Sequence, residues 1–129
     1  MSRPASKHPT ELELEILKVV WEKSPLAVRE VRRALAPVRK LAYTSVMTVM
    51  NIMVEKGYLA REKSGALFLY RPRITRKATS RRMLRDLMRR VFDGSAAAIM
   101  VNLIDSSDVK EHELRELREI LDRKSEGRK

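Results

Sequence analysis

The chain has 129 residues, of which 43% are hydrophobic, and this suits one compact domain with a smaller unit attached while excluding two large domains. Its 28 Lys and Arg residues against 17 Asp and Glu residues give a net charge of +11, which indicates a partner made of phosphates or anionic lipid. The sequence contains no cysteine, so disulfides, thiolate metal sites and a cysteine nucleophile are excluded.

The basic excess is concentrated at the front of the chain. Residues 1–77 hold 16 basic and 7 acidic side chains (+9), residues 78–93 hold 5 and 2 (+3), and residues 94–129 hold 7 and 8 (−1). We therefore expect the anionic partner to bind the first part of the chain. The longest apolar run, 96–101, is far shorter than the roughly 20 residues that span a bilayer, and the N-terminal segment lacks a hydrophobic signal core. We expect a cytoplasmic protein without membrane insertion.

Two helices are predicted at the start. Thr10 and Glu13 fit a capping box, an apolar stripe follows at helical spacing, and Pro25 ends the helix, which is predicted over residues 11–23. Apolar residues recur at helical spacing in a second helix, predicted over residues 28–36. Trp21 lies on the apolar side of the first helix and is expected in the core.

The third helix, predicted over residues 43–56, has an unusual outer flank. Its inner face is apolar at helical spacing, and Gly57 supplies the left-handed residue that ends it. No charged residue occurs between Thr44 and Val54, although a helix that only faces water gains from Lys and Glu pairs. The outer flank consists of Thr44, Ser45, Met47, Thr48, Asn51 and Ile52.

A two-stranded hairpin follows the third helix. Residues 58–62 and 67–71 are β-like, Ser64-Gly65 is a turn signal, and Pro72 prevents further ladder pairing. Because an isolated hairpin is marginal in water, its apolar face is expected to pack on the helices. Three short helices followed by a hairpin predict a mainly α winged helix-turn-helix domain with a small β-hairpin.

The last third is predicted to form a three-helix unit. An amphipathic helix begins near Ala78 and ends at Gly94, a helix that is apolar nearly all round follows and is expected to be buried, and the last helix starts with a capping pattern at Asp108 and Glu111. Such a unit cannot fill a core alone, so we expect it to pair with a second copy. The residues expected to dimerise are Leu84, Leu87, Met88, Val91, Phe92, Ile99, Leu103, Leu114, Leu117 and Leu121.

The domains are accordingly predicted as 1–77, a winged-helix DNA-binding domain with an N-terminal arm and a linker, and 78–129, a helical dimerisation domain. In the first, short uncharged side chains of the third helix would enter the major groove while neighbouring cations meet phosphates. The alternative is an ordinary half-buried helix with polar residues on its wet side. The predicted DNA-binding residues are Arg39, Lys40, Tyr43, Thr44, Ser45, Met47, Thr48, Asn51, Ile52, Lys63 and Arg71.

Signals for catalysis or cofactors are lacking. No Gly-rich phosphate loop, HExxH, GxSxG or spaced carboxylate pair occurs, so we expect no enzyme, no catalytic residue, no metal site and no cofactor. His8 and His112 are expected at the surface. A second interpretation stays open: a basic winged-helix module that packs DNA without reading it, or that binds a protein.

The strings "ELEILKVVWE", "AYTSVMTVMNIMVEKGYL", "GALFLYRP" and "VFDGSAAAIMVNLIDSSDVKEHELRELREIL" resemble the BlaI/MecI/CopY family of penicillinase-repressor regulators over about residues 10–124. The resemblance implies a homodimeric transcriptional repressor that binds an operator with dyad symmetry through the third helix and the wing. In several members a membrane sensor protease triggers cleavage at an Asn–Phe bond. The matching position here is Asn102-Leu103, where the asparagine agrees and the next residue is aliphatic.

Two further departures from the family pattern affect function. Copper-responsive members carry a C-terminal cysteine motif that this chain lacks. Penicillinase repressors often have a basic residue where Ile52 stands, which implies altered operator contacts.

Overall fold

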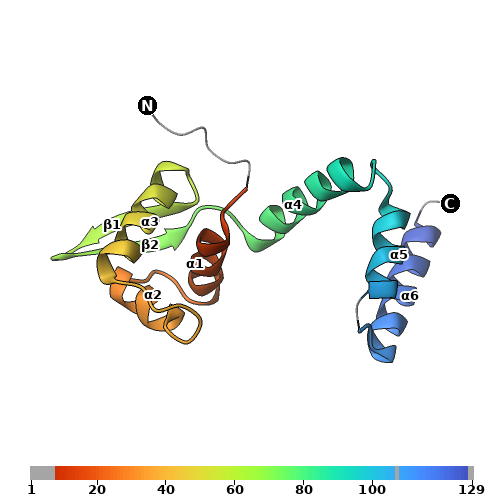
Figure 1. Ribbon diagram of the computed structural model, residues 1–129, viewed down its shortest axis with the longest axis horizontal. Coiled ribbons are helices and arrows are strands. Elements are labelled where there is room, and N and C mark those ends of the chain that lie inside the picture. Colours follow the sequence, from red (N-terminus) through yellow and green to blue (C-terminus); the bar gives the residue numbers. More distant parts are fainter. Residues whose placement is uncertain (1–7, 107, 128–129) are drawn as a thin grey trace. The chain divides into compact units, whose positions relative to one another are not determined.

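The computed structural model describes residues 8–106 and 108–127, so the expected N-terminal arm at residues 1–7 lies outside the described residues. The helices and strands follow the predicted order (Figure 1). They are α1 (Glu11–Glu22), α2 (Val28–Leu35), α3 (Tyr43–Glu55), β1 (Leu59–Ser64), β2 (Leu67–Pro72), α4 (Arg76–Val91), α5 (Ala96–Ser106) and α6 (Glu111–Glu126).

The chain divides into two compact units, the head (described residues 8–84) and the tail (described residues 85–127). The division falls inside α4, later in the chain than the predicted boundary between residues 77 and 78. The first half of α4 therefore groups with the head.

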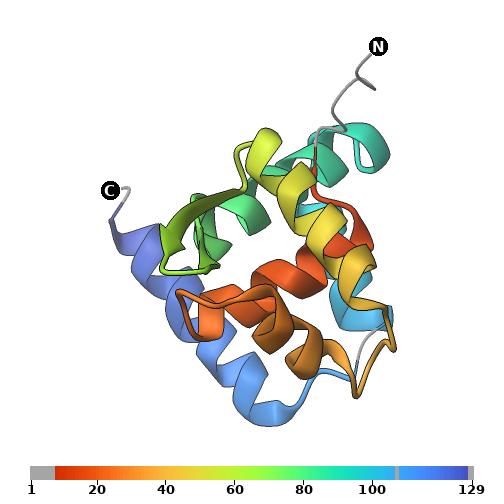
Figure 2. The ribbon, with the colours of Figure 1, turned by 90° about the vertical axis from the view of Figure 1, so that its left-hand side faces the viewer.

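The head is a winged helix-turn-helix, as predicted. Helices α1, α2 and α3 contact one another, and β1 and β2 form an antiparallel hairpin that contacts α1, α2 and α3 (Figure 2). The core consists of apolar side chains at helical spacing, Leu26 from the loop before α2 and one inward side chain from each strand. Its residues are Ile16, Leu17, Val20, Leu26, Val28, Val31, Leu35, Val46, Met50, Met53, Leu59 and Tyr70. Burial of this apolar surface is the main stabilising contribution to the head.

The hairpin is tighter than predicted, because its turn contains only Gly65 and Ala66. Ser64 pairs with Leu67 across the strands, and Gly65 adopts φ +61°, a left-handed conformation that glycine reaches without steric cost. The strands extend to residues 64 and 72, beyond the predicted ends. The wing is consequently a short, regular ribbon.

Backbone pairing also attaches the hairpin to the loop before α2. The Leu26 N–H donates to the Tyr70 carbonyl oxygen at 3.0 Å, and the Tyr70 N–H donates to the Leu26 carbonyl oxygen at 2.8 Å. The Tyr70 side chain is only 1% exposed. Tyr70 thus attaches β2 to the helices and the loop before α2, through both its backbone and its buried ring.

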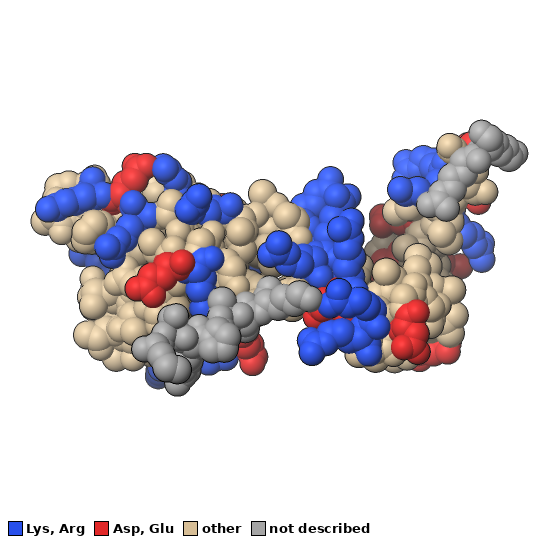
Figure 3. Space-filling view, turned by 90° about the horizontal axis from the view of Figure 1, so that it is seen from above, with Lys and Arg blue, Asp and Glu red and all other residues tan. Residues whose placement is uncertain are grey.

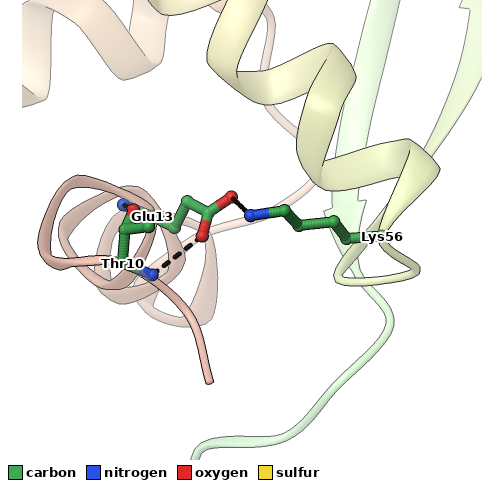
Figure 4. Close-up of polar contacts among 3 residues, drawn as sticks. All are labelled: Thr10, Glu13 and Lys56. Carbon is green, nitrogen blue, oxygen red and sulfur yellow. Dashed lines mark hydrogen bonds and ion pairs between the residues drawn. The ribbon is translucent and has the colours of Figure 1, made fainter. Parts of the chain in front are cut away.

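The predicted capping box at the start of α1 is confirmed, and it belongs to a larger contact (Figure 4). Thr10 Oγ1 accepts from the Glu13 N–H at 3.2 Å, and Glu13 Oε1 accepts from the Thr10 N–H at 2.8 Å. The other carboxylate oxygen, Glu13 Oε2, lies 2.9 Å from Lys56 Nζ, although Glu13 is only 2% exposed. This buried ion pair ties the beginning of α1 to the end of α3.

Trp21 packs against the core but is only partly buried. Its indole Nε1–H donates to the Ile74 carbonyl oxygen at 2.8 Å, and the Arg76 guanidinium carbon lies 5.4 Å from the ring centroid. The start of α4 is therefore held against α1 by one hydrogen bond and one cation–π contact.

Two expectations for the tail are wrong for the single chain. Helix α5 was expected to be buried, yet Ile99 is its only buried residue, because one copy of the tail offers no second layer to cover it. The last helix begins at Glu111 with Lys110 as its N-cap, and the Lys110 N–H donates to Glu113 Oε1 at 3.4 Å. Asp108 therefore lies before the cap and does not form the predicted capping pair with Glu111.

Candidate nucleic-acid interface

The outer flank of α3 is exposed and uncharged. Thr44, Ser45 and Thr48 are exposed, while Val46, Met50 and Met53 are fully buried on the opposite side of the helix. Tyr43 and Ile52 add exposed apolar area to the same flank. A ridge of short hydroxyl side chains without charges can approach base edges closely.

Met47 is less accessible than the hydroxyl residues of the same flank. It is half-buried and packs against the hydrophobic core, so less of it is available to a ligand than the position in the sequence suggested.

The cations before α3 differ in their contacts with the described residues. Lys40 is exposed. Arg39 Nε lies 2.7 Å from Glu15 Oε2, and Arg39 Nη2 lies 3.9 Å from Glu11 Oε1. The Arg32 Nε–H donates to the Leu41 carbonyl oxygen at 2.8 Å and so fixes the linker that leads into α3. Arg39 shares its charge with two carboxylates, which would compete with a phosphate for it.

The three cations of the wing differ in the contacts that they make. Lys63 is exposed and has no ion pair with a described residue. Arg71 pairs with Glu62, its diagonal neighbour on β1. Arg61 carries its guanidinium over the ring of Phe68, with 4.6 Å from the guanidinium carbon to the ring centroid.

Asn51 connects α3 to the wing. Its Oδ1 accepts from Arg61 Nη1 at 2.8 Å and from the Tyr70 hydroxyl at 2.8 Å. Arg61 and Tyr70 face each other across the hairpin, which brings both donors to the same side chain of α3. The DNA-binding residues predicted from the sequence did not include Arg61, because only the strand register reveals its position beside Asn51.

Positive charge also covers α4. On the face seen in Figure 3, Lys and Arg are numerous on the head and on α4, and Asp and Glu occur on the head as well as on the tail. Arg81, Arg82 and Arg85 are exposed, and Asp86 accepts from Arg89 at 2.8 Å and from Arg90 at 3.3 Å. Arg81 and Arg82 therefore add exposed positive charge to the head, and Arg85 adds it to the tail.

The described part of the chain has neither a metal-binding cluster nor a membrane-spanning helix. Its residues contain no cluster of His, Asp and Glu that could hold a metal ion. None of its helices is both long enough and apolar enough to cross a membrane. His8, expected at the surface, is half-buried, and His112 is exposed as expected.

The fold and the exposed uncharged flank of α3 define the class of winged-helix DNA-binding proteins. The family model described as "Penicillinase repressor" matches residues 9–123. The chain belongs to this penicillinase repressor family, whose members are transcriptional repressors and not enzymes.

Individual relatives are distant but cover most of the chain. The penicillinase repressor of Bacillus licheniformis is 25% identical over 113 residues, which cover 88% of each chain. The methicillin resistance regulatory protein MecI of Mammaliicoccus sciuri is 20% identical over 112 residues, covering 87% of this chain and 91% of its own. A solution structure of the DNA-binding domain of the repressor BlaI is 30% identical, with a TM-score of 0.48, and covers 56% of this chain and 90% of its own.

Proposed function

We propose that the chain is a homodimeric transcriptional repressor that binds a dyad-symmetric operator. In this proposal each head places α3 in the major groove of one half-site and its wing on the adjacent backbone, and the tail joins two heads. The observation that carries the proposal is the exposed, uncharged flank of α3 with Thr44, Ser45 and Thr48; Lys40 before the helix and Lys63 on the wing are exposed and form no ion pair with a described residue.

The proposed contacts follow from side-chain chemistry. Hydroxyl groups of Thr44, Ser45 and Thr48 can donate to or accept from base edges, and the apolar ends of Tyr43 and Ile52 suit thymine methyl groups. Lys40 and Lys63 would contact phosphates and fix the register of the head without reading sequence. Arg39 and Arg71 share their charge with Glu15 and Glu62, so these carboxylates would compete with a phosphate for them.

The exposed apolar side chains of the tail support the dimer. Large contiguous apolar surface on a soluble domain marks an interaction site. Two copies would each cover the α5 and α6 surface that a single chain leaves open, and a two-fold axis would give a dyad-symmetric pair of heads. Half-sites should then lie one helical turn, about 10 bp, or a multiple of it apart. The exposed residues of α5 and α6 are Met100, Val101, Leu103, Ile104, Leu114, Leu117, Ile120 and Leu121, and Leu84, Leu87 and Val91 are exposed on α4.

Competition binding tests the proposal against non-specific DNA packing. Genomic fragments selected by the protein should stay bound at about 150 mM salt in the presence of excess random DNA, because specific contacts persist when counterion release weakens. If random competitor displaces every selected fragment at that salt concentration, the DNA-packing alternative is favoured.

Thr48→Ala is expected to change sequence preference. The substitution removes a hydroxyl from the middle of the exposed flank without altering a buried side chain, so discrimination at one base pair should change by roughly 1 to 3 kcal/mol. Binding to a library of operators with single base changes measures this effect. An equal loss on every operator in the library would exclude base reading by Thr48.

We also propose regulated proteolysis at the Asn102-Leu103 bond, with a sensor protease as partner. Both residues are exposed, although they lie inside α5, so a protease requires local unwinding of that helix to reach the bond. Mass spectrometry of the protein from cells in which the repressed genes have become active should detect a fragment ending at Asn102. Recovery of only full-length protein from such cells would contradict this part of the proposal.

A further inference from the structure

We infer that Asn51 is a positioning residue at the junction of α3 and the wing. It orients Arg61, whose charge is not shared with a described carboxylate, for contact with a DNA phosphate. The inference rests on the proposed DNA-binding function and assigns Asn51 a role other than base reading. Arg61 becomes an additional DNA-contacting residue of the wing.

Hydrogen-bond chemistry fixes the orientation of the Asn51 amide. Arginine has only donors, so the Asn51 atom 2.8 Å from Arg61 Nη1 must be the oxygen. The Tyr70 hydroxyl donates to the same oxygen at 2.8 Å, and these two bonds use both of its lone pairs. Bidentate recognition of adenine needs a free amide oxygen together with the amide NH₂ group. Asn51 cannot make that contact while it holds Arg61 and Tyr70.

The partners of Arg61 differ from those of the other arginines around α3. Arg39 pairs with Glu15, and Arg71 pairs with Glu62, so each shares its charge with a carboxylate. Arg61 has a neutral amide on one side and the ring of Phe68 on the other. Among the described residues no carboxylate forms an ion pair with Arg61, so its full positive charge is left for a ligand.

Arg61 is also held ready for a contact. The Asn51 bond and the Phe68 ring restrict a side chain that otherwise loses up to about 2 kcal/mol of rotamer entropy on binding. One of the five guanidinium N–H donors binds Asn51, and the side chain is exposed, so other donors remain for a phosphate.

The support behind Asn51 is rigid. Tyr70 is 1% exposed, and its backbone N–H and carbonyl groups pair with Leu26. Its hydroxyl fixes Asn51 from the buried side, while Arg61 lies on the exposed side. Through Asn51, the position of the wing cation is tied to the core of the head.

The test is a double-mutant cycle on the full chain with selected operators and a single-base library, measured as a function of salt. Arg61→Ala should weaken binding to all sequences about equally, by roughly tenfold, and lower the slope of log affinity against log salt by about one. Asn51→Leu, which keeps size but removes the acceptor, should also weaken all sequences alike. The double variant should bind no more weakly than Arg61→Ala alone.

Two further variants serve as a control and as a second test of Asn51. Lys63→Ala should lower the salt slope by a similar amount. Its loss of operator affinity should multiply with the loss caused by Asn51→Leu, because Lys63 is not held by Asn51. Asn51→Asp keeps the oxygen that Arg61 binds and adds a negative charge, so it should lower the salt slope even if Asn51→Leu fails to fold. An unchanged salt slope in Asn51→Asp would overturn the inference.

The inference would also be overturned if Asn51→Leu changed the preference at one base pair. It would be overturned equally if the affinity losses of Asn51→Leu and Arg61→Ala multiplied in the double variant. These outcomes are separable from failure of the proposed function. If the unchanged chain shows no preference for its selected operators, the proposed function fails; if it shows that preference and the cycle shows no coupling, only the role of Asn51 fails.

Discussion

Leu117→Glu in α6 should lower affinity for an operator with two half-sites by about 10² to 10⁴, the contribution of joining two heads through the tail. Leu117 is exposed in the single chain, so the change should leave the monomer folded. In a two-fold dimer the new carboxylate would be buried in both copies without a partner, which costs several kcal/mol. Sedimentation should find a monomer, and binding assays should find unchanged affinity for one half-site.

Ser125→Glu is the matched control, because it adds the same charge at an exposed polar position of the same helix. It should leave both the dimer and operator affinity as they are. A monomeric Leu117→Glu protein that binds the complete operator as tightly as the unchanged chain would contradict the role proposed for the tail.

Lys56→Met is expected to lower the free energy of unfolding of the head by about 2 to 3 kcal/mol. The substitution keeps most of the side-chain volume but leaves the Glu13 carboxylate, which is 2% exposed, without its cation. Removing one partner of a fully buried pair costs about 3 to 5 kcal/mol. We expect less here, because the Lys56 side chain retains 21% exposure.

Urea denaturation followed by circular dichroism measures the effect. Glu13→Gln should cost less than Lys56→Met, because the amide oxygen can still accept from the Thr10 N–H while Lys56 turns toward solvent. Lys18→Met, at an exposed lysine of α1, should change stability by no more than about 0.5 kcal/mol. Equal stability of Lys56→Met and Lys18→Met would show that the ion pair contributes nothing.

Features that depend on local patterns were predictable from the sequence. The helix order, the capping box at Thr10 and Glu13, and the buried and exposed sides of α3 all follow from spacing within one segment. The winged-helix arrangement followed because three short helices and a hairpin have few ways to bury their apolar faces.

Features that depend on partners distant in sequence were not predictable. Spacing alone does not show that Arg39 meets Glu15, that Glu13 meets Lys56, or that the Asn51 oxygen is shared by Arg61 and Tyr70. The wrong expectation for α5 has a related cause. An all-round apolar helix is buried only when something covers it, and one copy of this tail supplies no such layer.

The most direct test of the central claim is chemical footprinting of the major groove on a selected operator. If the uncharged flank of α3 reads base edges, dimethyl sulfate should find guanine N7 atoms protected in two half-sites about one helical turn, or a multiple of it, apart. Thr48→Ala should alter protection in both half-sites. Protection of the sugar–phosphate backbone alone, with every guanine N7 still reactive, would contradict the account.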